Sequence, residues 1–295
     1  MTTAVGAAAQ RRRAEELAAT LPALQVAAEH VAATIAQGVH GRRRVGQGEA
    51  FWQFRRFETG DARQRIDWRQ SAKSQHLFVR ETEWEAAQSV WLWRDCSPSM
   101  HYRSSAELLP KVARAEVLLI ALMVLLVEGG ERIALLGNPE RPTTGRPALN
   151  RLAQAILDRD EPGSSLPENT PLPRHATVVL IGDFLAPLEE TDAVLRRYAA
   201  MGVSGYVLQV LDPAEVTMPF RGRSRFSGLE AEGDLMVGKA EGLRDAYLER
   251  LDNHVAALAT LVGAIGWSFS SHCTDRPPQP ALLALYTNLA DMVEV

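Results

Sequence analysis

Three oxygen-bearing side chains, spaced two residues apart, follow a short apolar segment. They are Asp95, Ser97 and Ser99 in the run DCSPSM, directly after the segment 89–94 (SVWLWR). In an open parallel α/β sheet, ligands bind at the carboxyl ends of the strands, near the point where the strand order reverses. A turn at this place can aim the three side chains at one point, where hydroxyls ligate a cation and the carboxylate supplies charge. Oxygen-only ligands favour Mg²⁺, Mn²⁺ or Ca²⁺ over softer metals.

A second acidic residue ends another apolar segment. Asp183 follows the run TVVLIG at 177–182. In a doubly wound sheet these two segments are neighbours, so we expect Asp183 to lie beside Asp95. The structural alternative is that Asp and Ser at a strand-to-helix junction serve only as turn and helix-capping residues.

The elements that would position these residues alternate between strands and helices. Short apolar strands separated by helices indicate a parallel sheet covered on both faces, so we predict one doubly wound, mainly parallel α/β domain at 86–295. Residues 213–240 interrupt the alternation with Pro, Gly and mixed charges, and we expect a hairpin insertion there. The predicted strands are 89–94, 132–136, 177–181, 204–211 and 267–271, and the predicted helices are 107–128, 148–157, 188–201, 243–262 and 280–292.

The first 85 residues show a different pattern. Alanine, leucine and valine at helical spacing predict an N-terminal helix at 11–37, and a Gly-rich basic connection follows. Residues 51–85 mix aromatic and charged side chains without clean periodicity until the run LFVRETE. We therefore expect a small, largely irregular β excursion that ends in a strand. The whole region 1–85 is predicted to pack on the main domain.

Composition excludes several classes of protein. The chain has 295 residues, a formal net charge of -4 and only two cysteines, too few for a disulfide framework and not arranged as a CxxC pair. The N-terminus lacks the apolar core of a secretory signal. The most apolar run, 117–127, is too short to cross a bilayer of about 30 Å. We therefore expect a cytoplasmic protein without a membrane span.

Charge is unevenly distributed along the chain. Residues 1–80 hold 13 basic and 7 acidic side chains, a net charge of +6, whereas residues 81–295 hold 19 and 29, a net charge of -10. Arginine triplets at 11–13 and 42–44 could mark a surface for nucleic acid. No aromatic residues interleave with them, as they do in proteins that stack on bases, so we expect no nucleic-acid partner. No Gly-rich phosphate-binding motif follows a strand, so we expect no nucleotide cofactor.

Sequence patterns typical of enzymes are weaker than the pattern of the DCSPSM loop. The histidines lack the HxxxH and HxH spacings of metal sites, and Ser99 lacks the GxSxG turn of a serine hydrolase. The enzymatic alternative is a metal-dependent hydrolase or phosphatase that uses Asp95 and Asp183. A phosphatase would need a lysine near a later strand end, and the two downstream lysines, Lys111 and Lys239, are in no obvious place for it. We therefore predict that the protein is not an enzyme.

A polar run upstream of the DCSPSM loop resembles a known family. Its order, ending in Val-Arg-Glu before the strand that leads into the loop, is similar to that of the bacterial domain-of-unknown-function 58 (DUF58) family, over about residues 40–137. The resemblance implies protein binding without established enzymatic activity. It also implies a MoxR-type AAA+ ATPase as partner, with the chain as an adaptor in assembling or maturing a client protein. The residues that carry the resemblance are Gly60, Asp61, Arg65, Asp67, Trp68, Arg80 and Glu81.

The DCSPSM loop itself resembles the metal-ion-dependent adhesion site of von Willebrand factor A domains. Asp95, Ser97 and Ser99 match its first motif, and Asp183 takes the place of its later aspartate. The resemblance implies a von Willebrand A-like, Rossmann-like fold. That site also takes a threonine from a second loop, where this chain offers Ser165 as a substitute. If the hydroxyl were missing, affinity for Mg²⁺ would be weak or absent and the loop would be a rigid polar turn.

The run Arg65-Ile66-Asp67-Trp68-Arg69 supports two interpretations. As structure, Asp67 pairs with a neighbouring arginine and Trp68 packs on the domain. As function, Arg65, Asp67 and Arg69 present a charged recognition surface. We favour the structural interpretation, because charge pairs beside a tryptophan commonly anchor irregular segments.

Overall fold

The chain divides into two compact units, with the boundary at residues 87 and 88. The computed structural model describes residues 45–46, 50–56, 66–73, 76–83, 89–157, 163–230 and 233–293. The predicted helix at 11–37 lies outside the described residues, as do Gly60, Asp61 and Arg65.

The larger unit contains a five-stranded sheet. Its strand order is β10-β7-β6-β4-β5, and every neighbouring pair is parallel. The chain passes from β4 to β5 at one edge and then returns to β6 on the other side of β4, so the strand order reverses between β4 and β6. The prediction of an α/β fold with a mainly parallel sheet is confirmed. The strands are β4 (Ser89–Arg94), β5 (Arg132–Leu135), β6 (Thr177–Gly182), β7 (Ser204–Leu211) and β10 (Ser268–Cys273).

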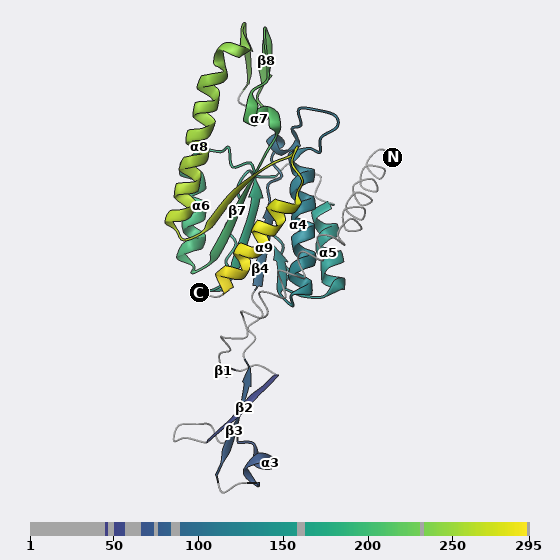
Figure 1. Ribbon diagram of the computed structural model, residues 1–295, viewed down its shortest axis with the longest axis vertical. Helices are drawn as coiled ribbons and strands as arrows, with labels where there is room; N and C mark the ends of the chain where they lie inside the picture. The colour runs from purple at the N-terminus through teal and green to yellow at the C-terminus, as the bar shows by residue number, and fades with distance from the viewer. Residues whose placement is uncertain are drawn as a thin grey trace. The chain divides into compact units, whose positions relative to one another are not determined.

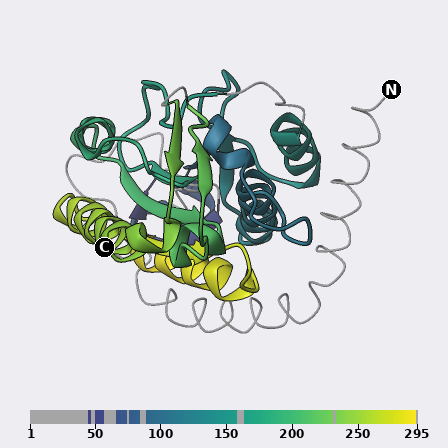
Figure 2. The same cartoon turned by 90° about the horizontal axis from the view of Figure 1, so that it is seen from above.

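Helices cover both faces of this sheet. Successive residues of a strand point to opposite faces, and accordingly Leu92 is buried in the core cluster beneath α4, α5 and α9, while Trp93 is buried in the cluster beneath α6 and α8. These layers can be followed in Figure 1 and, from above, in Figure 2. The helices are α4 (Lys111–Glu128), α5 (Arg146–Leu157), α6 (Leu188–Ala200), α8 (Arg244–Ala264) and α9 (Gln279–Val293).

Helix α4 forms the centre of one layer. Its apolar run is buried against the sheet, as expected for a core helix. The predicted start at Glu107 is wrong by one turn, because Pro110 occupies the N-cap position and Lys111 is the first helical residue. Among the described helices, none is long and apolar enough to cross a membrane.

A hairpin leaves the larger unit after β7. Strands β8 (Ser224–Ser227) and β9 (Asp234–Val237) pair in antiparallel fashion, and Arg225 of one forms an ion pair with Asp234 of the other. The hairpin lies between the short helix α7 (Pro213–Thr217) and the 3-10 turn η3 (Ala240–Leu243) that precedes α8. Figure 1 shows it at the end of the unit where the sheet strands finish.

The smaller unit is more regular than the sequence indicated. Strand β3 (Phe78–Glu83) pairs in antiparallel fashion with both β1 (Val45–Gly46) and β2 (Ala50–Arg56), and a one-turn helix, α3 (Trp68–Ser71), precedes β3. The prediction of an irregular segment up to LFVRETE was therefore wrong for β2. Aromatic residues are common in strands, but Phe51 and Trp52 are adjacent and the register shifts between Phe51 and Gln53, so the strand shows no regular alternation.

Candidate functional site

Asp95 is the first residue after β4 and lies at the point where the strand order reverses. Its backbone N–H donates to the carbonyl of Ile181 on β6 at 2.8 Å, so the ladder fixes its position. Its Oδ1 accepts a hydrogen bond from the backbone N–H of Ser97 at 2.7 Å. The residue is 0% exposed, and its Oδ2 has no hydrogen-bond partner among the described residues. A buried carboxylate oxygen without a partner is costly, so this atom requires an explanation.

The 3-10 turn η2 (Pro98–His101) places two hydroxyls beside Asp95. Ser97 precedes the turn and Ser99 lies within it. Their Oγ atoms are 3.1 Å apart, and the Ser99 hydroxyl donates to Asp183 Oδ2 at 2.6 Å. The structure therefore brings Asp95, Ser97, Ser99 and Asp183 together across β4 and β6.

The turn that carries Asp183 is held from the neighbouring strand and helix. The side-chain amide of Gln209 on β7 donates to the Asp183 carbonyl at 2.9 Å. The next residue, Phe184, has a positive φ of 49°, which is uncommon outside glycine and signals local strain. His254 Nε2 of α8 donates to the Phe184 carbonyl at 2.7 Å. These contacts fix a strained turn in the position that directs Asp183 toward Ser99.

Lys111, the first residue of α4, also contacts Asp183. Its side chain is 0% exposed, and its Nζ lies 2.9 Å from Asp183 Oδ2 and 2.6 Å from Glu215 Oε1. The sequence-based view that Lys111 is in no obvious place was therefore wrong. Asp183 and Glu215 are 72 and 104 residues away in the chain, so only the fold brings them to this lysine.

Glu215 connects this lysine to helix α7. Asp212 is the N-cap residue of α7, where its Oδ1 accepts from the Ala214 N–H at 2.8 Å and Glu215 Oε2 accepts from the Asp212 N–H at 2.7 Å. This arrangement is a capping box. The other oxygen of Asp212, Oδ2, accepts from the Ser104 N–H at 2.9 Å. The loop before α4 and the start of α7 are therefore joined through carboxylates next to the candidate site.

Burial sets the protonation of Asp95. Loss of water contact raises its pKa from 3.8 to about 6, the hydrogen bonds from Ser97 oppose this rise, and the nearby charge of Asp183 adds to it. The carboxylate is therefore largely ionised at neutral pH, at a cost to stability. A cation beside Oδ2 would remove part of that cost.

Lys111 is charged despite its burial. Burial disfavours its ammonium, but the charges of Asp183 and Glu215 outweigh this effect and raise the pKa of Lys111 above its ordinary value. Burial also raises the pKa of Glu215, against the attraction of Lys111. Among the described residues, the ammonium of Lys111 is therefore shared between the carboxylates of Asp183 and Glu215.

The donor set fits a hard divalent cation in three respects. Adjacent ligands of an octahedral Mg²⁺ lie about 3 Å apart, close to the 3.1 Å between the two serine hydroxyls. Asp95 Oδ2 is buried and unpartnered among the described residues. A Cβ on Gly182 would lie 2.8 Å from Asp95 Cβ and 3.1 Å from Oδ2, so only glycine leaves this side of the carboxylate open.

The same donor set limits how a cation could be held. Among the described residues, no group of three or more His, Cys, Asp or Glu side chains is placed to hold a metal ion. The serine hydroxyls would therefore have to supply direct ligands. Ser165, the predicted substitute for the missing threonine, is half-buried and makes no hydrogen bond to the described residues, although Gly163 in the same loop donates to the Cys96 carbonyl at 3.0 Å.

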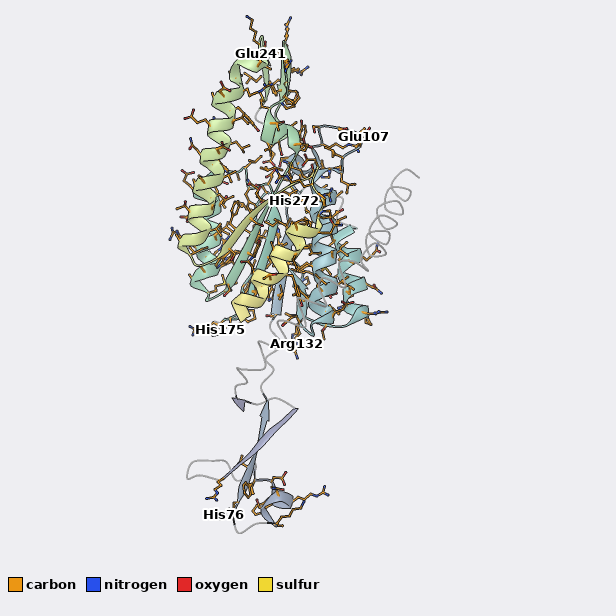
Figure 3. All side chains as sticks on the ribbon, viewed as in Figure 1. His76, Glu107, Arg132, His175, Glu241 and His272 are labelled. Carbon is orange, nitrogen blue, oxygen red and sulfur yellow. The ribbon has the colours of Figure 1, made fainter. Side chains whose placement is uncertain are left out.

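The site faces the end of the unit where the strands finish. Figure 3 shows Arg132 and His175, which lie near the beginnings of β5 and β6, at one end of the unit, and Glu107 and Glu241 at the other. Ser99 is half-buried, whereas Asp95, Ser97 and Asp183 are buried. Ser99 is therefore the member of the site that is closest to solvent.

Two of the predicted residues of the smaller unit, Asp67 and Trp68, lie at the start of α3. Among the described residues, Asp67 forms no ion pair with an arginine; its Oδ1 accepts from the Gln70 N–H at 2.9 Å and caps α3. Trp68 is 66% exposed, so its ring is not packed within its unit. The Asp-Trp pair therefore begins a helix, and the expected packing of Trp68 on the main domain stays a prediction. Arg80 and Glu81 lie on β3.

Comparison with protein families gives the assignment. The family model described as "Protein of unknown function DUF58" matches residues 53–257, which is more than half of the chain. The chain belongs to the DUF58 family. The match begins in β2 and ends in α8, so it covers parts of both units and includes the ends of β4 and β6. The predicted membership is confirmed.

Related proteins extend this similarity over most of the chain. Proteins of Mycobacterium bovis and Mycobacterium tuberculosis, each named only as an uncharacterized protein, are 24% identical over 279 residues, which cover 88% of this DUF58 chain and 86% of theirs.

Two solved structures are also similar. The conserved hypothetical protein BatB from Bacteroides thetaiotaomicron is 15% identical with a TM-score of 0.41. An aerotolerance-related membrane protein from Bacteroides fragilis is 14% identical with a TM-score of 0.42. Each match covers 70% of this chain and 100% of the other. Because these TM-scores are low, the fold of this DUF58 member rests on its own strand order.

Proposed function

We propose that this DUF58 protein is a non-enzymatic, von Willebrand A-like binding module whose contact surface is the sheet edge where β4 and β6 end. Support comes from the reversal of strand order there, since such points are the usual ligand sites of open α/β sheets. On the outer side of the edge strand β5, Thr143 pairs with Ile133 through an isolated antiparallel bridge.

The observation that carries the proposal is the unpartnered Oδ2 of Asp95 beside two hydroxyls. Asp95, Ser97, Ser99 and Asp183 would hold Mg²⁺ or Mn²⁺, with the serines as direct ligands and the aspartates balancing its charge. When bound, the cation would offer an open position to a carboxylate of the partner protein. Ser99 is half-buried, so the partner's side chain would approach past it.

The proposed partner is a MoxR-type AAA+ ATPase, with the chain acting as its adaptor in assembling or maturing a client protein. The resemblance to DUF58, now supported by the family match, is the basis of this step. We also propose that the protein acts with that ATPase in the cytoplasm. The unequal charge along the chain allows the two units to contact partners of opposite charge.

Ser97→Ala is expected to weaken the binding of Mn²⁺ by about 10-fold or more, because it removes a direct ligand of a site with few carboxylates. Calorimetric titration of Mg²⁺ and Mn²⁺ into chelator-treated protein measures this. Ser104→Ala is the matched control, since the Ser104 side chain is exposed and only its backbone N–H contacts Asp212. Absence of heat at millimolar metal for the wild type, or equal affinity of the two variants, would contradict the cation site.

A metal-dependent hydrolase is the second candidate, and the position of Lys111 is the observation that favours it. A lysine beside Asp183 could neutralise a phosphate bound near Asp95. Against this, both short contacts of the Lys111 ammonium are to carboxylates of the protein itself. Hydrolysis of p-nitrophenyl phosphate with Mg²⁺ that disappears in Asp95→Ala would establish the hydrolase; we expect no such activity.

A further inference from the structure

We propose that Lys111 is a resident cation that competes with the divalent cation for Asp183 and thereby sets the metal affinity of the site. This inference rests on the proposed function, because it needs the cation site at the ends of β4 and β6. It assigns a role to a buried lysine that the resemblance to other proteins does not include.

A single oxygen is the object of the competition. Asp183 Oδ2 accepts the Ser99 hydroxyl at 2.6 Å and lies 2.9 Å from Lys111 Nζ. The site that would hold the divalent cation therefore shares this atom with the ammonium. A divalent cation on the Ser99 hydroxyl and the ammonium of Lys111 would both be balanced by this one carboxylate, and the two positive charges repel each other strongly in a buried environment. Binding of the divalent cation would then weaken the contact between Lys111 and Asp183.

Glu215 gives Lys111 a second position. The Nζ atom is 2.6 Å from Glu215 Oε1, a shorter distance than to Asp183, and the capping box of α7 fixes the other oxygen of Glu215. Lys111 can therefore lose Asp183 and remain paired. A buried ammonium without any partner would be strongly unfavourable, so this second carboxylate makes the exchange feasible.

The charges of the site explain why it would hold both the Lys111 ammonium and a divalent cation. Without a divalent ion, Lys111 is the only described side-chain cation in hydrogen-bond contact with Asp183 or Glu215. It neutralises Asp183 but makes no hydrogen bond to Asp95, whose Oδ2 is left without a partner among the described residues. The lysine therefore holds the site together before metal binding, and the unpartnered Asp95 retains the attraction for a second cation.

The test compares metal affinity after the same change at two lysines. Lys111→Gln removes the charge but keeps a polar group that can donate hydrogen bonds, and we expect the variant to bind Mn²⁺ more tightly than the wild type, by about 10-fold or more. Lys239→Gln makes the identical charge change at an exposed position and is expected to leave the affinity unchanged. Calorimetry or the electron paramagnetic resonance signal of free Mn²⁺ gives the affinities.

The outcomes separate this inference from the proposed function. If the wild type binds Mn²⁺ and Lys111→Gln binds no more tightly, the competition is overturned and the cation site remains. If both lysine variants bind more tightly by the same factor, the effect is one of net charge and the competition is again overturned. If neither the wild type nor Lys111→Gln binds Mn²⁺ at millimolar concentration, the cation site itself fails.

A second measurement uses the wild-type protein and therefore does not depend on whether a variant folds. The sequence contains only Lys73, Lys111 and Lys239, so acetylation of each lysine can be followed by mass spectrometry. Lys73 and Lys239 are exposed and serve as internal references, whereas Lys111 is buried. We expect saturating Mg²⁺ to increase the acetylation rate of Lys111 relative to both references. An unchanged or lower relative rate in protein that binds Mg²⁺ would overturn the competition.

Discussion

Replacing Asp95 with asparagine is expected to raise the free energy of unfolding by about 3 kcal/mol near pH 8 in metal-free solution. Burial raises the pKa of Asp95 from 3.8 to about 6, so the unfolded chain releases this proton more readily than the folded chain. The stability contributed by the neutral carboxyl is therefore complete below pH 3.8 and is lost as the pH rises to about 6. The amide has no charge to bury and keeps an oxygen that can accept from Ser97.

Urea unfolding of the wild type and Asp95→Asn at about pH 8 and about pH 4 checks this expectation. The difference should nearly vanish at the lower pH, where folded Asp95 is neutral. Asp252→Asn, at an exposed position of α8, is the matched control and should show little difference at either pH. Saturating Mg²⁺ should reduce the advantage of the variant, because only the wild type has the carboxylate for the cation. A less stable Asp95→Asn in metal-free solution would show that Asp95 is already paired.

Gly205→Ala is expected to lower the free energy of unfolding by about 3 kcal/mol or more. A Cβ at this position would lie 2.1 Å from Cε3 of Trp267, closer than any atomic contact allows. The indole cannot move aside easily, because it is buried and its Nε1 donates to the Val203 carbonyl at 3.1 Å. The substitution would therefore separate the start of β7 from the residue that precedes β10.

The matched control for this change is Gly263→Ala. Gly263 lies in α8, is exposed, and a Cβ there would meet nothing within 4 Å. Because alanine favours a helix over glycine, this variant should gain up to about 1 kcal/mol. Thermal or urea unfolding of both variants measures the change in the free energy of unfolding, which should be a decrease for Gly205→Ala and an increase for Gly263→Ala. If Gly205→Ala stayed within about 0.5 kcal/mol of the wild type, the packing of Trp267 on β7 would be contradicted.

Much of the larger unit could be predicted from sequence because the inner strands β4, β6 and β7 are buried on both faces. Strand β7 was predicted with the bounds that the structure shows, since Ser204–Leu211 is a nearly continuous apolar run behind a glycine. The start of α4 could have been placed correctly from Pro110, because proline is tolerated in the first turn of a helix and not inside one. The smaller unit was harder, since β2 shows no regular alternation and only its pairing with β3 makes the strand clear.

The sequence predicted those residues of the candidate site that directly follow neighbouring strands. Asp95 and Asp183 each follow an apolar strand, and neighbouring parallel strands bring such residues to one edge. Lys111 and Glu215 could not be placed this way, because their contact depends on where α4 and α7 begin relative to the sheet. A lysine at the first position of a mainly apolar helix, in a chain with three lysines, was the available signal.

The affinity of the purified chain for a purified MoxR-type ATPase from the same organism tests the central claim most directly. The measurement uses constant Mg²⁺ and ATP and compares the wild type with Ser97→Ala and Ser104→Ala, so that the metal supply of the ATPase does not change. We predict that Ser97→Ala weakens the complex by about 10-fold or more, while Ser104→Ala binds like the wild type. A wild-type complex that Ser97→Ala leaves equally tight, or no complex with the wild type, would contradict binding through the cation site.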